Sequence, residues 1–116
     1  GFVPVMAPLT HDGNGQLLNT NADTIAAEVA KSLAASFDVT LTYCFEKAGV
    51  LRDPDDDSSV IPFIDKDIFQ ALVADGTVSG GMLPKLQNAF EALDHGVGKV
   101  IITHSSALSA GTTLTR

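Results

Sequence analysis

The stretch "GGMLPKLQNAFEALDHGVGKVIITH", residues 80–104, contains one complete helix-to-strand unit. Proline is favoured in the first turn of a helix, and the apolar residues that follow Pro84 recur at helical spacing, beginning with Leu86. Gly96 can end this helix, and the β-branched run over residues 99–104 is typical of a buried strand. The stretch therefore predicts a helix that packs against a sheet and leads directly into one of its strands.

A lysine stands at the start of this helix, where its charge is unfavourable. The N-terminus of a helix carries partial positive charge, and Lys85 in the first turn adds to it. An anion beside Lys85 would remove this repulsion. Gly80 and Gly81 precede the helix, and glycine lets a ligand approach the backbone closely. The sequence therefore predicts an anion close to Lys85.

The rest of the chain alternates strands with helices, which is typical of an α/β protein. The remaining predicted elements are a β-hairpin with arms at 2–9 and 16–18, a helix over 22–37 capped by Asn21, a strand over 38–45, a helix between Asp65 and Gly76, and a final strand over 112–116. We expect a largely parallel sheet flanked by helices, with a β-hairpin at the N-terminal end. Such sheets bind ligands beyond the carboxyl ends of their strands.

Composition limits the possible functions. The 116 residues, 45% of them hydrophobic, suffice for one domain over 1–116. A net charge of -7 disfavours nucleic-acid and membrane partners. The single cysteine, Cys44, is predicted to be buried in a strand and inert, which suits a cytoplasmic location. Residues 53–64 begin like a calcium loop but lack its glycine and its final glutamate, so no metal ligand is predicted.

Three segments together carry a resemblance to a known family. They are "NTNAD" at 19–23, "DGTVSGGMLPKLQNAFEALDHGVGKV" at 75–100 and "GTTL" at 111–114. In this combination the chain resembles the carboxyl-terminal half of the acetylglutamate kinases, within the amino acid kinase family. The resemblance implies ATP-dependent phosphorylation of the side-chain carboxylate of N-acetyl-L-glutamate, or another N-acyl-L-glutamate, in arginine biosynthesis. It also implies ATP and Mg²⁺ as cofactors.

The resemblance assigns roles by position. It implies that Lys85 and Asp23 are catalytic, with Asp23 orienting lysines by ion pairing, and that Asn19 binds the acylglutamate. The residues that it places around the nucleotide are Lys47, Gly49, Val50, Leu51, Thr77, Val78, Ser79, Gly80 and Gly81. The segment "TYCFEKAGVL", residues 42–51, lacks an aspartate that is usual in the family, which leaves the contacts to the base and ribose open.

The resemblance further implies that the amino-terminal half of the enzyme, with its own phosphate-binding groups, is missing here. We therefore expect the isolated chain to be inactive and the complete enzyme to be a homo-oligomer. Two alternatives stay open at this stage. One is an enzyme similar to glutamate 5-kinase, and the other is a non-catalytic nucleotide-binding or regulatory domain of the same fold.

Overall fold

The computed structural model describes residues 1–116 and contains two separate sheets. The strands are β1 (Leu9–His11), β2 (Leu17–Asn19), β3 (Thr40–Phe45), β4 (Phe63–Ile64), β5 (Lys99–His104) and β6 (Thr112–Leu114), and the helices are α1 (Ala22–Ala34), α2 (Lys66–Ala74) and α3 (Met82–Asp94). Strands β1 and β2 form the antiparallel hairpin. The other four strands form one sheet in the order β3-β5-β6-β4.

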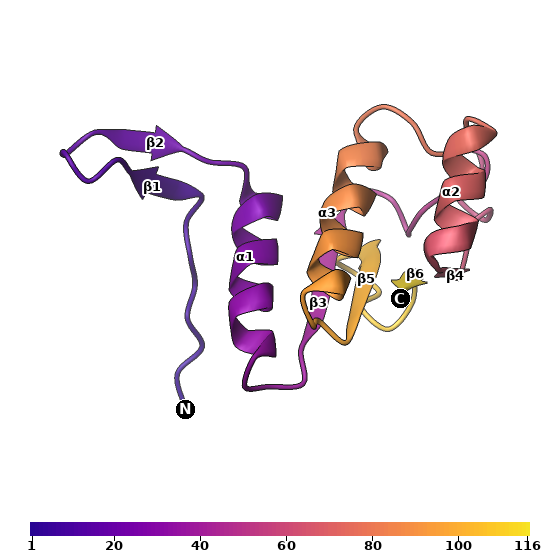
Figure 1. Ribbon diagram of the computed structural model, residues 1–116. Helices are drawn as coiled ribbons and strands as arrows, with labels where there is room; N and C mark the ends of the chain where they lie inside the picture. Colours follow the sequence, from indigo (N-terminus) through magenta and orange to yellow (C-terminus); the bar gives the residue numbers. More distant parts are fainter.

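The main sheet is mostly parallel, as predicted. Strand β3 pairs with β5 in parallel, as β4 does with β6, while β5 and β6 are antiparallel. Helices α1, α2 and α3 contact β3, β4 and β5, and they lie side by side along one face of the sheet (Figure 1). The starts of α1 and α3 therefore lie on the same side of the molecule as the carboxyl end of β3 (Figure 1).

The helix-to-strand unit at 80–104 forms the centre of the core. Helix α3 buries Leu86, Ala89, Phe90 and Leu93, the apolar positions expected from the helical spacing. Strand β5 follows and buries Val100, Ile102 and Thr103 completely. The predicted caps are also present, since the Asn21 side chain accepts a hydrogen bond from the first turn of α1 and that of Asp65 does so for α2.

The prediction that Cys44 is buried is wrong, because Cys44 is exposed. Strand β3 lies at the edge of the sheet, and its side chains alternate between two faces. Leu41 and Tyr43 point towards the helices and are buried, whereas Thr42 and Cys44 point to the opposite, uncovered face. The apolar run in the sequence could not show that only one face is covered.

The predicted first arm of the hairpin, residues 2–9, is also wrong, because the strand begins only at Leu9. Only Leu9–His11 form the first arm, and residues 1–7 belong to no strand. This segment runs along α1 instead of beside a strand, so its backbone has no ladder to join (Figure 1). Helix α1 ends at Ala34 rather than at residue 37, and past its end the amide of Ser36 donates to the carbonyl of Leu33 three residues back, as in the tighter last turn of many helices. No helix in the structure combines the length and the apolar character needed to cross a membrane.

Candidate functional site

An ion pair between α1 and α3 lies at the centre of the candidate site. Asn21 Oδ1 accepts a hydrogen bond of 2.8 Å from the amide of Asp23, which fixes the first turn of α1. The Asp23 carboxylate lies 2.5 Å from Nζ of Lys85, the fourth residue of α3. The Lys85 side chain is 19% exposed and that of Asp23 is 32% exposed. The anion that the sequence predicts beside Lys85 is therefore, within this chain, the Asp23 carboxylate.

Two aromatic rings from β3 complete the surroundings of the Lys85 ammonium. Its Nζ lies 5.2 Å from the ring centre of Tyr43 and 5.6 Å from that of Phe45. At these distances the negative face of each ring attracts a cation. The Tyr43 hydroxyl also donates a hydrogen bond of 3.0 Å to the backbone carbonyl of Asp23. Residues from α1, β3 and α3 therefore hold one ammonium at the carboxyl end of β3.

The hydroxyl of Tyr43 titrates at unusually high pH. Burial, together with the nearby negative charge of Asp23, raises the pKa of Tyr43 to about 12. A tyrosine in the unfolded chain has a pKa of about 10. The folded state therefore keeps this proton over a pH range in which the unfolded chain has lost it. The stabilisation is complete below pH 10 and is lost as the pH rises towards 12.

We therefore expect the unfolding free energy of the chain to fall between pH 10 and 12 partly through Tyr43. Tyr43→Phe has no such proton. The wild type should therefore lose its advantage in unfolding free energy over this variant as the pH rises through that interval. Urea denaturation of both proteins at a series of pH values measures the difference, and the comparison cancels the titration of the lysines. A difference that stays constant up to pH 12 would contradict the assignment.

A cavity of about 190 Å³ lies at the start of α3, the helix that carries Lys85, and collects most of the residues predicted to contact a nucleotide. Its walls come from the segment after β3 and from the connection between α2 and α3. The lining residues predicted from the sequence are Lys47, Gly49, Val50, Leu51, Thr77 and Ser79. Pro54 and Met82 also line it and were not predicted. Two segments about thirty residues apart in sequence therefore meet at one cavity.

The other predicted residues lie around this cavity or away from it. Val78 is a core residue whose amide donates to the carbonyl of Leu72. Gly80 has a positive φ of 55°, and a Cβ at Gly80 or Gly81 would meet no atom within 4 Å. Neither glycine amide donates a hydrogen bond within the chain. The approach to the start of α3 is thus open, as a backbone contact with a ligand requires.

One ion pair and one hydrogen-bonded turn involve residues that line the cavity. Lys47 Nζ lies 3.6 Å from a carboxylate oxygen of Asp57, in an exposed pair. Across the cavity, the backbone amide of Thr77 donates a hydrogen bond to the carboxylate of Asp75. Hydrogen bonding from Thr77 lowers the pKa of Asp75. The charged Asp75 thereby holds the turn that carries Thr77 into the cavity wall.

Asn19 is not brought to this cavity. It ends β2 on the hairpin, its side chain is exposed, and no hydrogen bond joins it to Asp23 or Lys85. The hairpin projects beyond the start of α1, away from α2 and α3 (Figure 1). The structure contains no group of three or more His, Cys, Asp or Glu side chains that could hold a metal ion.

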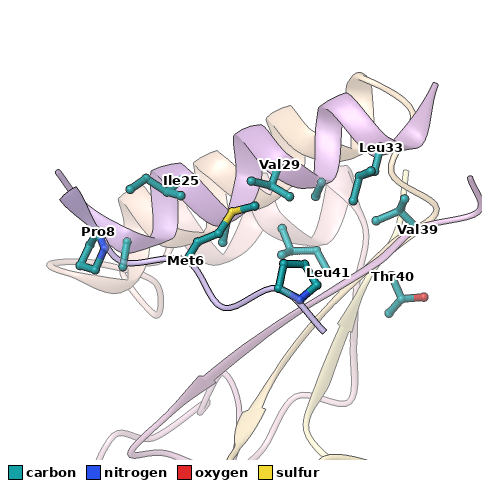
Figure 2. Close-up of a pocket in the computed structure, with 12 residues that line it drawn as sticks. Met6, Pro8, Ile25, Val29, Leu33, Val39, Thr40 and Leu41 are labelled. Atoms are coloured by element: carbon teal, nitrogen blue, oxygen red, sulfur yellow. The ribbon is translucent and has the colours of Figure 1, made fainter. Parts of the chain in front are cut away.

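A second, larger cavity of about 360 Å³ is apolar and lies on the other side of α1. Met6 and Pro8 of the N-terminal segment face Ile25, Val29 and Leu33 of α1 across it, as Figure 2 shows. The buried residues of α1 are instead Ala27 and Ala30, and their small side chains let α1 pack closely on α3. This cavity holds no charged group, so it is not a site for an anion.

Comparisons with known proteins agree on one family. The sequence profile described as the amino acid kinase family matches residues 1–104. A protein of Phocaeicola vulgatus named acetylglutamate kinase is 64% identical over 111 residues, which is 96% of this chain and 43% of that protein. One of the same name from Bacteroides thetaiotaomicron is 66% identical over 108 residues, covering 93% of this chain and 42% of that protein. The chain thus spans about two fifths of the length of these relatives.

Solved structures of similar fold extend this result. The Streptococcus mutans protein smu.665 superposes with a TM-score of 0.79 and 32% identity, over 97% of this chain and 42% of that one. An N-acetylglutamate synthase from Neisseria gonorrhoeae, solved with coenzyme A and L-arginine, superposes with a TM-score of 0.78 and 26% identity. That match covers 95% of this chain and 27% of the synthase.

Proposed function

The chain belongs to the amino acid kinase family, and on that premise we propose that it is the nucleotide-binding part of an acetylglutamate kinase. The complete protein would transfer the γ-phosphoryl group of ATP to the side-chain carboxylate of N-acetyl-L-glutamate, or of another N-acyl-L-glutamate, in arginine biosynthesis. The observation that carries this proposal is that six of the nine residues that the resemblance assigns to nucleotide binding line one and the same cavity.

Lys85 is suited to the chemistry of phosphoryl transfer. In that reaction negative charge is spread over the oxygens of the transferred group, and positioned cations stabilise it. An ammonium has three donors, so Lys85 can keep its contact with Asp23 and still donate to a phosphoryl oxygen. In this proposal Asp23 holds the ammonium in place. The start of α3 adds its own partial positive charge from the same direction.

The cavity fits part of ATP. Pockets that bury a whole small ligand have volumes of about 300 to 1,000 Å³, so a cavity of about 190 Å³ would hold one portion of the nucleotide. The remaining contacts, and the binding of the acylglutamate to which Asn19 is assigned, would involve the amino-terminal half of the complete protein. The homo-oligomeric state and the cytoplasmic location stay predictions.

The chain has no group of three or more His, Cys, Asp or Glu side chains that could hold a metal ion. Mg²⁺ usually keeps several waters and binds substrate phosphates, and it uses few protein carboxylates. We therefore propose that Mg²⁺ arrives with ATP and name no residue of this chain as its ligand.

The first test compares two exposed lysines in the complete protein. Lys47 and Lys66 each form an exposed ion pair with an aspartate, but only Lys47 lines the cavity. Lys47→Ala should raise the Kd for MgATP on the order of tenfold, because it removes a charged donor near the nucleotide. Lys66→Ala should leave the Kd unchanged. Isothermal titration calorimetry measures both values.

Equal Kd values for the two variants would exclude the cavity as the nucleotide site. No binding of MgATP by the complete wild-type protein would favour the non-catalytic alternative.

A further inference from the structure

We infer that Tyr43 and Phe45 are positioning residues for Lys85, forming an aromatic seat that holds its ammonium at one place at the carboxyl end of β3. The inference rests on the proposed role of Lys85 in phosphoryl transfer. No motif in the family resemblance points to these two residues. They belong to the segment where the chain departs from the usual family pattern.

The strand geometry explains why both rings face the same ammonium. Residues two apart on a strand point to the same side, so Tyr43 and Phe45 both project towards the helices. Lys85 reaches this side from α3 and places Nζ 5.2 Å and 5.6 Å from the two ring centres. The Asp23 carboxylate meets the same ammonium from α1. The ammonium is thus bounded by three groups.

The ion pair alone would hold Lys85 only loosely. A lysine side chain has four rotatable bonds, and partly exposed ion pairs contribute little because water competes for both charges. The two rings add further restraint on the Lys85 side chain. They exclude water from two sides, which leaves the lysine side chain only 19% exposed, and their faces attract the cation. The rings therefore restrict where the ammonium can go.

The Tyr43 hydroxyl adds a second restraint. It donates to the backbone carbonyl of Asp23 and so joins β3 to the first turn of α1. That turn carries the carboxylate that pairs with Lys85. Packing alone does not require this group, because Leu41 fills the same face of β3 two residues earlier without a polar atom. The ring thus restrains the cation, and the hydroxyl restrains its counter-charge.

The kinetic test uses the complete enzyme with saturating N-acetyl-L-glutamate and MgATP. Tyr43→Leu and Phe45→Leu, which remove a ring, should each lower kcat roughly tenfold, with the KM for ATP within about twofold. Tyr43→Phe, which removes only the hydroxyl, should lower kcat about threefold. Phe69→Leu is the matched control, since the partly buried Phe69 ring stacks on Phe90 with ring centres 5.0 Å apart and neither lines the cavity nor faces the Lys85 ammonium. It should lose stability but keep kcat.

A second readout does not depend on turnover. Rings that face Lys85 should shift the NMR signals of its ε-methylene group upfield of those of the other lysines. Lys85→Arg identifies the signals by removing them. Tyr43→Phe should keep the upfield shift, whereas Phe45→Leu and Tyr43→Leu should each reduce it. If Tyr43→Leu does not fold, Phe45→Leu and Tyr43→Phe still decide the result.

Two results would overturn the inference. One is a kcat for the ring-removing variants that equals that of Phe69→Leu. The other is a Lys85 ε-methylene signal that coincides with the other lysines in the wild type. A wild-type enzyme that shows the upfield shift but transfers no phosphoryl group would overturn the proposed function instead, and with it the catalytic purpose of the seat.

Discussion

Replacing Lys85 by alanine in the complete enzyme is expected to lower kcat on the order of a hundredfold or more, while the KM for ATP changes much less. The reason is that the charge on the transferred phosphoryl group develops in the transition state, where a compact cation stabilises it most. Steady-state kinetics with MgATP and N-acetyl-L-glutamate measure both constants. Lys85→Arg should recover only part of the loss, because its planar group cannot place a donor at the same point between Asp23 and the two rings.

The stability of Lys85→Ala separates catalysis from folding. The variant leaves Asp23 without its partner, but that side chain is 32% exposed and water can solvate the carboxylate. Surface ion pairs contribute about 0 to 1 kcal/mol, so we expect a loss of that order in the unfolding free energy. A near-normal kcat would refute the catalytic role. A loss of several kcal/mol would show that the Lys85–Asp23 pair serves the fold.

Gly111→Ala is expected to reduce the unfolding free energy by at least about 3 kcal/mol, because the new Cβ has no room. Gly111 has a φ of 100°, and a Cβ there would lie 2.3 Å from the carbonyl oxygen of Ile102. The next residue, Thr112, is fully buried, and its hydroxyl donates to the carbonyl of Ile61 and accepts from the amide of Val50. Movement at Gly111 would therefore disturb the centre of the sheet and the cavity wall together.

Gly76→Ala is the matched control for this prediction. Gly76 has a similar φ of 82°, but a Cβ there would meet no atom within 4 Å. Its cost should be about 1 to 2 kcal/mol, the penalty of the backbone conformation alone. Urea denaturation of both variants measures the difference. Equal losses would show that the structure around Gly111 can relax and that the predicted clash is not real.

The sequence predicted the elements whose signals are local. Helix α3 followed from its apolar spacing, and α1 and α2 followed from their caps at Asn21 and Asp65. Strand β4 was missed because two residues are too few to show a period. The exposure of Cys44 was missed because the sequence does not reveal which face of an edge strand is covered.

The sequence likewise predicted only part of the candidate site. The unfavourable position of Lys85 indicated an anion, but Asp23 lies 62 residues away, so only the resemblance suggested the pair. The two rings around Lys85 were missed, because alternation in "TYCF" gives the spacing of Tyr43 and Phe45 but not their neighbours. Likewise Met82 reaches the cavity through the fold of the connection before α3, which carries no local signal.

The central claim is that the complete protein phosphorylates an N-acylated glutamate, and turnover of two substrates in parallel tests it most directly. The complete enzyme is given MgATP with either N-acetyl-L-glutamate or free L-glutamate, and ADP release is followed for each. We predict sustained turnover with N-acetyl-L-glutamate, little with free glutamate, and loss of turnover in Lys85→Ala. Preferential turnover of free glutamate would contradict the claim in favour of a glutamate 5-kinase-like activity, and turnover of neither substrate would contradict the proposed kinase function itself.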